Sequence, residues 1–203
     1  MAHKKILLSF GLTALLGIPL LMAFSAAFAD GHRRHVELPF RAMLGDARFD
    51  AIMRGERGFP HYLGREKRAP DFSLPDRHGR EYKLSERRGR VVVMNFWSIT
   101  CPPCVEEMPS YEALSEIAAK YGDVDVVAVS ADQSFEAVRE VLSPSSKVIH
   151  LFDPEREVLT GLYGTELFPE TWIIDRDGVI RFRYDGPFDW SNPVVLSLIE
   201  RFR

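Results

Sequence analysis

The chain has 203 residues, of which 46% are hydrophobic and 27% are charged, proportions that are ordinary for a globular protein. A formal net charge of −3 provides no general electrostatic attraction to nucleic acid, so no nucleic-acid partner is expected. With only two cysteines the chain cannot be a disulfide-rich scaffold, and its fold must depend on a hydrophobic core.

The N-terminal segment, residues 1–29, has the pattern of an export signal. Lys4 and Lys5 precede a long apolar run that ends in the small-x-small triplet Ala27–Ala29. An apolar run of about 20 residues is also long enough to span a bilayer. We therefore predict cleavage after Ala29, with a retained inner-membrane anchor as the alternative. In both cases the rest of the chain lies outside the cytoplasm, in the periplasm or a similar compartment, and it contacts the membrane only if the segment is retained.

Residues 30–68 are interpreted as a linker or N-terminal extension. Within them, residues 44–53 predict a short amphipathic helix, and the glycines and proline that follow predict loops. The clear domain spans residues 69–203. At its start, apolar residues alternate with polar ones on both sides of the turn at residues 76–79, which predicts a β-hairpin.

After the hairpin, buried-strand patterns alternate with helical ones. Strands are expected at residues 91–97, 124–130, 148–152, 171–175 and 179–184. Helices are expected at residues 102–121, 134–142, 154–163 and 191–203. This order predicts an α/β fold, a three-layer sandwich in which a central mixed sheet has helices on both faces and the hairpin is an N-terminal extension.

The two cysteines, Cys101 and Cys104, stand where the first of these strands ends and the first helix begins. Two thiols at this spacing can close a disulfide and open it again. Cys101 is nearest the helix N-terminus, where free N–H groups and the helix dipole favour a thiolate, so we predict that Cys101 attacks and Cys104 resolves the mixed disulfide. Pro102 and Pro103 offer the thiolate no N–H, so we expect partial stabilisation and a reducing pair.

Two other interpretations of the cysteine pair are a static disulfide and a metal site. A disulfide within one helical turn closes a very small loop and stabilises the fold little. Structural zinc usually needs four ligands, and none of His61, His78 and His150 has ligand spacing. We therefore predict a redox role for the pair, with no metal and no cofactor.

Four segments together resemble the TlpA/ResA-like branch of the thioredoxin superfamily. They are Ala69–Pro75 (APDFSLP), Val93–Trp97 (VMNFW), Cys101–Pro109 (CPPCVEEMP) and Phe168–Gly178 (FPETWIIDRDG). The Pro-Glu-Thr in the last segment is similar to that of the cytochrome c maturation reductases, the CcmG/DsbE group. The resemblance covers residues 69–203. It implies a thioredoxin-like fold and thiol–disulfide exchange, usually as a reductant, with disulfide-containing envelope proteins and a membrane electron donor as partners.

The resemblance also implies a substrate-binding surface beside the dithiol. In this fold a cis-proline faces the dithiol; the matching position is Pro169, and Phe168 before it is expected to pair with the substrate like a β-strand. Thr100 and Pro102, on the two sides of Cys101, are predicted to complete the surface. Relatives usually carry tryptophan at the position of Thr100. The small hydroxyl there bears on which partner docks, and not on the exchange chemistry.

Glu107 is the third predicted catalytic residue. It follows Cys104 by three residues, on the same face of the helix, where a carboxylate can move protons to and from the buried sulfur. Related proteins have a glutamate at this place with that proposed role; the alternative is a solvated helix glutamate. Asn95 stands where cytoplasmic thioredoxins bury an aspartate, so no proton transfer is expected by that route. Trp190 is expected to be a packing residue.

The predicted function is therefore that of an exported thiol–disulfide oxidoreductase that reduces disulfides in envelope proteins, with cytochrome c maturation as one context. The reverse direction uses the same residues. A thiol peroxidase is an alternative, since peroxiredoxins share the Ala-Pro-Asp-Phe opening, but their motif has threonine three residues before the cysteine, where this chain has Ser98. An envelope copper chaperone is a further alternative, although such proteins space their cysteines by three residues.

Overall fold

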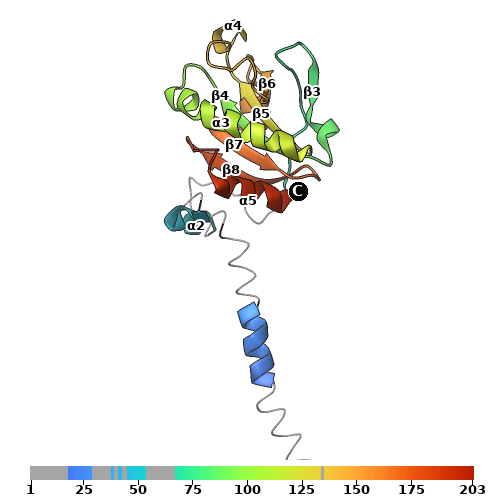
Figure 1. Cartoon of the computed structure of the whole chain (residues 1–203), viewed down its shortest axis with the longest axis vertical. Helices are drawn as coiled ribbons and strands as arrows, with labels where there is room; N and C mark the ends of the chain where they lie inside the picture. The colour runs from blue at the N-terminus through green and yellow to red at the C-terminus, as the bar shows by residue number, and fades with distance from the viewer. Residues whose placement is uncertain (1–17, 29–37, 39–40, 43–44, 54–66, 134) are drawn as a thin grey trace, which may run out of the picture. The chain divides into compact units, whose positions relative to one another are not determined.

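The computed structural model describes residues 18–28, 38, 41–42, 45–53, 67–133 and 135–203 (Figure 1). The chain divides into two compact units, Met1–Asp46 and Ala47–Arg203. In the first unit, residues 18–28 are helical. Among the described residues, no helix has both the length and the apolar character needed to cross a bilayer. Most of the predicted signal, and the loops expected after residue 53, lie outside the described residues.

The second unit is built on a six-stranded mixed sheet with the strand order β1-β8-β7-β4-β5-β6. Strands β4, β5 and β6 are parallel, whereas β7, β8 and β1 continue the sheet in antiparallel pairs. The strands are β1 (Lys67–Arg68), β4 (Val91–Trp97), β5 (Val124–Ser130), β6 (Ile149–Phe152), β7 (Glu170–Ile174) and β8 (Val179–Asp185). Every residue of β4 and β5 is buried, as expected for central strands covered on both faces.

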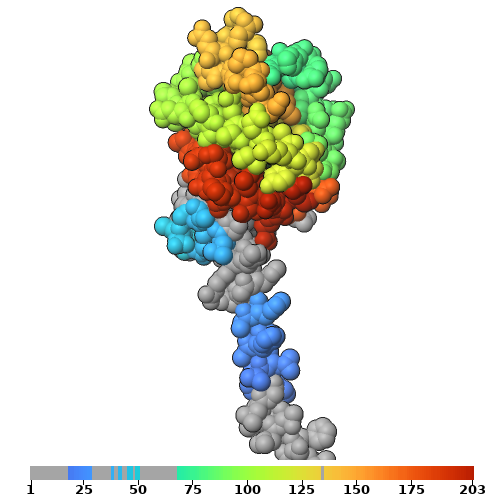
Figure 2. Space-filling view, in the orientation of Figure 1, coloured from blue at the N-terminus to red at the C-terminus, as the bar shows by residue number. Residues whose placement is uncertain are grey.

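Helices α3 (Pro102–Tyr121) and α5 (Pro193–Phe202) lie over the same face of the sheet (Figure 1). In the space-filling view, α3 and the C-terminal segment hide the strands behind them (Figure 2). The other face is covered by the hairpin of β2 (Ser73–Pro75) and β3 (Glu81–Lys83) and by segments that share its apolar core, including Tyr163. The mixed three-layer arrangement predicted from the sequence is therefore present.

The helix expected at residues 134–142 is wrong in its length, because α4 spans only Phe135–Val138. The N–H of Val141 bonds to the carbonyl of Val138, a tightened i→i+3 contact that ends the helix, and the N–H of Ser143 bonds instead to the Glu112 carboxylate. Pro144 follows at once and disfavours a helical residue before it.

The helix expected at residues 154–163 is also wrong, since only a single π-helical stretch, Glu157–Leu162, is present. Arg156 has a φ of 56°, in the left-handed region, which no α-helix can include. The Asp153 carboxylate then accepts hydrogen bonds from the N–H groups of Glu157, Val158 and Leu159. The helical stretch therefore begins at Glu157, three residues after the expected start, because the buried Asp153 caps it there. The pattern of apolar residues contains no signal for this cap.

The remaining elements agree closely with the expected ranges. The closing helix α5 begins at Pro193 after the N-cap Asn192, whose side chain accepts the N–H of Val194. Helix α2 (Asp46–Met53) corresponds to the short helix expected at residues 44–53, and Phe49 in it is buried. Strand β1 lies in the range interpreted as linker, and a two-residue strand carries too little pattern to be seen in a sequence.

His150 is buried in the edge strand β6, and neither of its ring nitrogens has a hydrogen-bond partner. Burial, with a smaller contribution from the positive charge of Arg77, lowers the pKa of His150 from 6.5 to about 3. The folded state therefore disfavours the imidazolium. The unfolded chain takes up this proton below pH 6.5, whereas the folded protein does not. His150 therefore does not reduce the free energy of unfolding above pH 6.5, and it reduces it progressively as the pH falls toward 3.

We predict that His150 lowers the free energy of unfolding of the wild type by about 2 kcal/mol at pH 5, and that His150→Leu abolishes this decrease. Denaturant unfolding of the wild type and the variant at pH 7.5 and pH 5 measures the difference. His78→Ala, which removes an exposed histidine instead of the buried one, is the matched control. Equal pH dependence in the wild type and His150→Leu would contradict the prediction.

Candidate active site

Cys101 and Cys104 form a disulfide at the N-terminal end of α3, with their Cα atoms 5.3 Å apart. Strand β4 ends at Trp97, and a three-residue loop leads to Cys101, which is the N-cap of the helix. The Cys101 carbonyl accepts the N–H groups of Cys104 and Val105, at 3.0 and 3.2 Å. Cys101 is partly exposed, whereas Cys104 is fully buried. One sulfur is thus open to a partner and the other is not.

The two prolines occupy the first two positions of α3. Proline is well suited to this place because the N–H that it lacks would have no partner within the helix. Pro102 is exposed, beside the partly exposed Cys101, and can therefore contact a docked partner. With no N–H on either proline, fewer backbone donors remain near the sulfur than at an ordinary helix N-terminus.

The loop before Cys101 is held by the buried Asp132, which sequence reasoning did not find. Its carboxylate accepts hydrogen bonds from the Ser98 hydroxyl at 2.7 Å, the Ile99 N–H at 2.9 Å and the Ser130 hydroxyl at 2.7 Å. Because the single Ser98 proton is used on Asp132, the Thr100 hydroxyl must be the donor in its 2.9 Å contact with Ser98. The Thr100 proton is therefore not directed at the dithiol.

The peptide bond between Phe168 and Pro169 is cis. Strand β7 begins directly after it, and its first residue, Glu170, pairs with Phe96 near the end of β4. Pro169 therefore lies at the same end of the sheet as the dithiol, as the family resemblance implies. A hollow of about 510 Å³ is lined by this turn, in which Leu167 is 82% exposed while Phe168 is partly buried against the core.

Glu107 is buried, which excludes the solvated-glutamate interpretation. One carboxylate oxygen, Oε1, accepts a hydrogen bond from Asn95 Nδ2 at 2.9 Å. The other, Oε2, accepts from the Phe188 N–H and from Trp190 Nε1, both at 3.1 Å. Trp190, expected only to pack, is thus a polar partner of the carboxylate. An indole N–H must find an acceptor when buried, but the sequence does not say which one.

Burial raises the pKa of Glu107 to about 7, although its three hydrogen bonds act in the opposite direction. Glu107 is one of the residues that line a hollow of about 370 Å³, together with Glu106, Ser110 and the segment 187–189. Glu107 therefore stands one helical turn from the buried Cys104, beside this hollow and with a proton affinity suited to exchange near neutrality.

A second buried glutamate, Glu170, was not identified from the sequence. Its Oε1 accepts from the Thr165 hydroxyl at 2.5 Å and Trp172 Nε1 at 2.6 Å, and its Oε2 forms an ion pair with Arg183 at 2.6 Å. Burial raises its pKa, while the bond to Thr165 and the charge of Arg183 lower it. The Pro-Glu-Thr signature was the available signal. Glu170 holds the strand that follows the cis peptide bond.

The structure brings most of the predicted site residues to one end of the sheet. Those at the start of α3 and in the loop before it are Thr100, Cys101, Pro102 and Cys104, and those before β7 are Phe168 and Pro169. Among the residues that the structure describes, no group of three or more histidine, cysteine, aspartate or glutamate side chains is placed to hold a metal ion.

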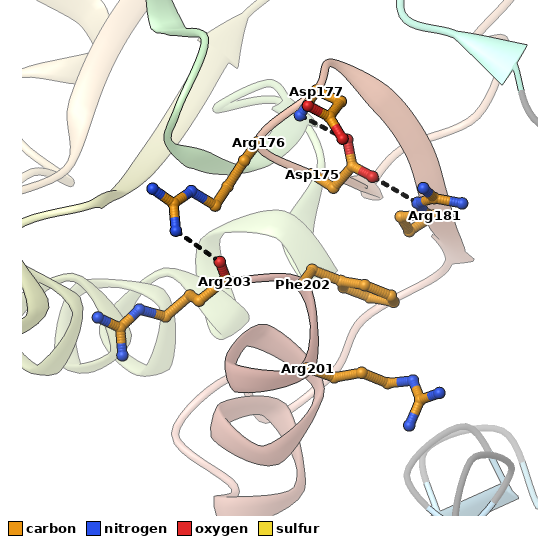
Figure 3. A pocket seen from close by; sticks show the side chains of 7 residues that line it. All are labelled: Asp175, Arg176, Asp177, Arg181, Arg201, Phe202 and Arg203. Carbon is orange, nitrogen blue, oxygen red and sulfur yellow. Dashed lines mark hydrogen bonds and ion pairs between the residues drawn. The ribbon is translucent and has the colours of Figure 1, made fainter.

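A further hollow, of about 590 Å³, lies at the opposite end of the sheet (Figure 3). Asp175, which follows the last residue of β7, lines this hollow. Because Ile174, the last residue of β7, pairs with Val92 near the beginning of β4, the hollow lies at the end of the sheet away from the dithiol. Figure 3 shows Arg181 paired with Asp175, at 2.5 Å, and Arg176 donating to the Arg203 carbonyl, at 2.7 Å. This basic hollow is separate from the redox site.

The sequence profile of the Redoxin family matches residues 65–199. The chain belongs to the Redoxin family. The thiol–disulfide oxidoreductase ResA of Bacillus thuringiensis (strain Al Hakam) is 30% identical over 140 residues, which cover 64% of this chain and 79% of the relative.

Two solved structures extend the comparison. A protein from Chlorobium tepidum, assigned as the thiol:disulfide interchange protein DsbE, superposes with a TM-score of 0.59 at 28% identity, covering 70% of this chain and 99% of the other. A protein from Neisseria meningitidis, assigned as a thioredoxin, gives 0.57 at 30% identity, covering 66% and 87%. The protein is thus a thiol–disulfide oxidoreductase with a thioredoxin-like fold, similar to the TlpA/ResA-like branch.

We predict that Glu107 makes the fold less stable as the pH rises. Because its folded pKa of about 7 lies above the ordinary 4.5, its favourable contribution is complete below pH 4.5 and is lost as the pH rises through 7, a change of about 3 kcal/mol. Glu107→Gln should remove this dependence. Denaturant unfolding of the wild type and of Glu107→Gln at pH 5 and pH 8 measures the free energies of unfolding. If the two proteins differed by the same free energy at both pH values, the raised pKa of Glu107 would be contradicted.

Proposed function

We propose that this protein is exported and reduces disulfide bonds in proteins of the cell envelope. The observation that carries the proposal is a disulfide-forming pair with one accessible and one buried sulfur, and with the Glu107 carboxyl buried one turn beyond it. Support for the envelope location comes from the signal-like pattern of residues 1–29. The names of the relatives support exchange between thiols and disulfides.

In the proposed reaction, the reduced enzyme transfers two electrons to its partner. The Cys101 thiolate attacks one sulfur of the partner's disulfide, and the other partner sulfur leaves as a thiolate. Cys104 then loses its proton to Glu107 and attacks Cys101, which releases the second partner sulfur. The enzyme ends as the Cys101–Cys104 disulfide. A dithiol donor at the membrane must return the two electrons by the same exchange in reverse.

The substrate is proposed to bind along the turn that contains the cis peptide bond. Phe168 presents its backbone at the start of β7, and the exposed Leu167, Thr100 and Pro102 provide apolar and polar contacts around the dithiol. We further propose the CxxCH segments of apocytochromes c as substrates, on the resemblance of Pro169–Thr171 to the cytochrome c maturation reductases. An oxidised CxxCH peptide and a peptide of shuffled sequence with the same disulfide spacing distinguish a specific reductase from a general one.

We predict different failures for the two cysteine variants. Cys101→Ser should lose all measurable reduction of a model disulfide, because no accessible thiolate remains. Cys104→Ser should attack once and then accumulate a mixed disulfide through Cys101, because no resolving thiol remains. Mass spectrometry of the enzyme after incubation with an oxidised peptide detects the adduct. Steady turnover by either variant would contradict the mechanism.

The reduction potential of the Cys101–Cys104 pair tests the direction of exchange. We predict a value near that of thioredoxin, about −270 mV, as suits a reductant, whereas a value near about −120 mV would indicate an oxidant. Redox equilibration against glutathione or dithiothreitol buffers measures it.

Two further assays test the alternative functions. Consumption of hydrogen peroxide at a rate comparable to that of disulfide reduction would favour the thiol peroxidase, and tight copper binding to both thiols would favour the copper chaperone.

Glu107→Gln tests the proposed proton transfer. We predict that it slows resolution of the mixed disulfide by about 100-fold at pH 7, within the usual range for loss of a general base. The first attack by Cys101 should change little. Rapid-quench measurement of the two steps separates them, with Glu116→Gln, an exposed glutamate on the same helix, as the matched control. A wild-type resolution rate in Glu107→Gln would eliminate the carboxylate as the proton acceptor.

A further inference from the structure

The Asn95 side chain links Glu107 to the neighbouring strand. Asn95 is 1% exposed, and its Nδ2 donates to Glu107 Oε1 and to the Thr171 hydroxyl, at 2.9 Å in both cases. Asn95 and Thr171 are direct partners across β4 and β7, so the strand register fixes their side chains on the same face of the sheet. Thr171 is the last residue of the Pro-Glu-Thr signature.

The other amide atom of Asn95, its Oδ1, is buried without a hydrogen-bond partner. A buried amide oxygen left unpaired costs about 1–3 kcal/mol, so the observed orientation of the amide is kept by the two bonds that Nδ2 makes. A half-turn of the amide about its last torsion exchanges Oδ1 and Nδ2 and needs no movement of the backbone. After that turn, Oδ1 would face both Glu107 and Thr171, and Nδ2 would take the place that has no partner.

The hydrogen bonds of Glu107 decide where its proton can sit. Oε2 already faces two donors, the Phe188 N–H and Trp190 Nε1, so a proton on Oε2 would oppose them. The neutral acid must therefore carry its proton on Oε1, which faces Asn95. An Oε1–H group opposite an N–H group of Asn95 is a clash of two donors, whereas opposite Oδ1 it forms a hydrogen bond.

We propose that Asn95 and Thr171 form a reversible hydrogen-bond relay that follows the proton of Glu107. When Glu107 is ionised, Asn95 Nδ2 donates to both Glu107 and Thr171, as seen here. When Glu107 is neutral, the Asn95 amide is turned, and Oδ1 accepts from the Glu107 acid and from the Thr171 hydroxyl. The threonine hydroxyl serves both states because it can donate or accept.

This inference rests in part on the proposed function, because the relay matters for exchange only if Glu107 takes the Cys104 proton. In the resolving step the proton passes from the Cys104 sulfur to Glu107 Oε1, while the sulfur bonds to Cys101. Asn95 does not itself carry the proton. It is a positioning residue that provides a partner for either form of the carboxyl, so that the proton can be gained or lost near neutrality without rearrangement of the strands.

The other ionisable groups around Glu107 do not replace this relay. On α3 itself, burial raises the pKa of Tyr111 well above its ordinary value, so its hydroxyl stays neutral, and that hydroxyl contacts the carbonyls of Val93 and Val127. Glu106 and Asp189 border the hollow beside Glu107. Cys104 is the proton donor in the proposed reaction. On β4 and β7, the groups directed at this point are Asn95 and Thr171.

The decisive measurement is an NMR titration of the wild-type full-length chain in its disulfide form. The ¹³C signal of the Glu107 carboxyl and the ¹⁵N and ¹H signals of the Asn95 side-chain amide are followed from pH 5 to pH 9. The relay requires both to change with a common midpoint near the pKa of Glu107, about 7. Titration of Glu107 while the Asn95 amide signals stay constant would overturn the proposal.

A variant provides a second, independent readout. Asn95→Leu keeps the side-chain size but removes the partner of both forms of Glu107. Because the lost N–H bond to the ionised carboxylate is charge-assisted and is the stronger of the two, the Glu107 midpoint should rise by about 1 pH unit, and the midpoint in the pH profile of the resolving step should rise with it. Thr165→Val, which removes a buried hydroxyl from the Glu170 carboxylate, is the control and should leave that midpoint unchanged. Loss of stability in Asn95→Leu with an unshifted midpoint would show a purely structural role.

The two proposals fail in different ways. If the amide and carboxyl signals titrate together but the protein reduces no disulfide, the relay stands and the proposed reductase function is wrong. If the protein reduces disulfides and the Asn95 signals do not respond to pH, the relay is wrong and the function stands. If Asn95→Leu does not fold, the wild-type titration still decides.

Discussion

The arrangement of the site depends on the hydrogen bonds that the buried carboxylate of Glu107 accepts. Its own helix carries the dithiol, and its hydrogen-bond donors come from β4 and from the loop between β8 and α5. A charge in this position is tolerated only while those donors are in place, because an unpaired buried charge is very costly. The contacts that join the helix, the sheet and the C-terminal loop are therefore also the contacts that set the proton affinity of Glu107.

The Pro-Glu-Thr segment has a physical explanation in the alternation of side chains along a strand. Successive residues of β7 point to opposite faces of the sheet. Glu170 contacts Thr165, Trp172 and Arg183, while Thr171 contacts Asn95 on the face that carries α3. A single tripeptide thus connects the cis peptide bond, a buried ion pair and the polar network of the active site.

Much of the fold could be predicted because its strongest signals are local. Two mostly apolar runs predicted β4 and β5, and the cysteine motif followed by a helical pattern predicted α3, all at their observed bounds. The two failed helices depended on non-local or conformational details: the left-handed Arg156 after the buried Asp153, and the early end of α4 at Val138. Neither detail changes the apolar spacing from which a helix is inferred.

By itself, the sequence determined the chemistry of this protein: two cysteines one turn apart at a strand–helix junction, with a glutamate one turn further along the helix, and a proline matched to the cis position through the family resemblance. Only the tertiary structure decided the environment of these groups. It buried Glu107, gave it Asn95, Phe188 and Trp190 as donors, and placed Asp132 under the loop before Cys101. The reason is that a proton affinity depends on desolvation and on the donors that surround a group, and these come from segments far apart in the chain.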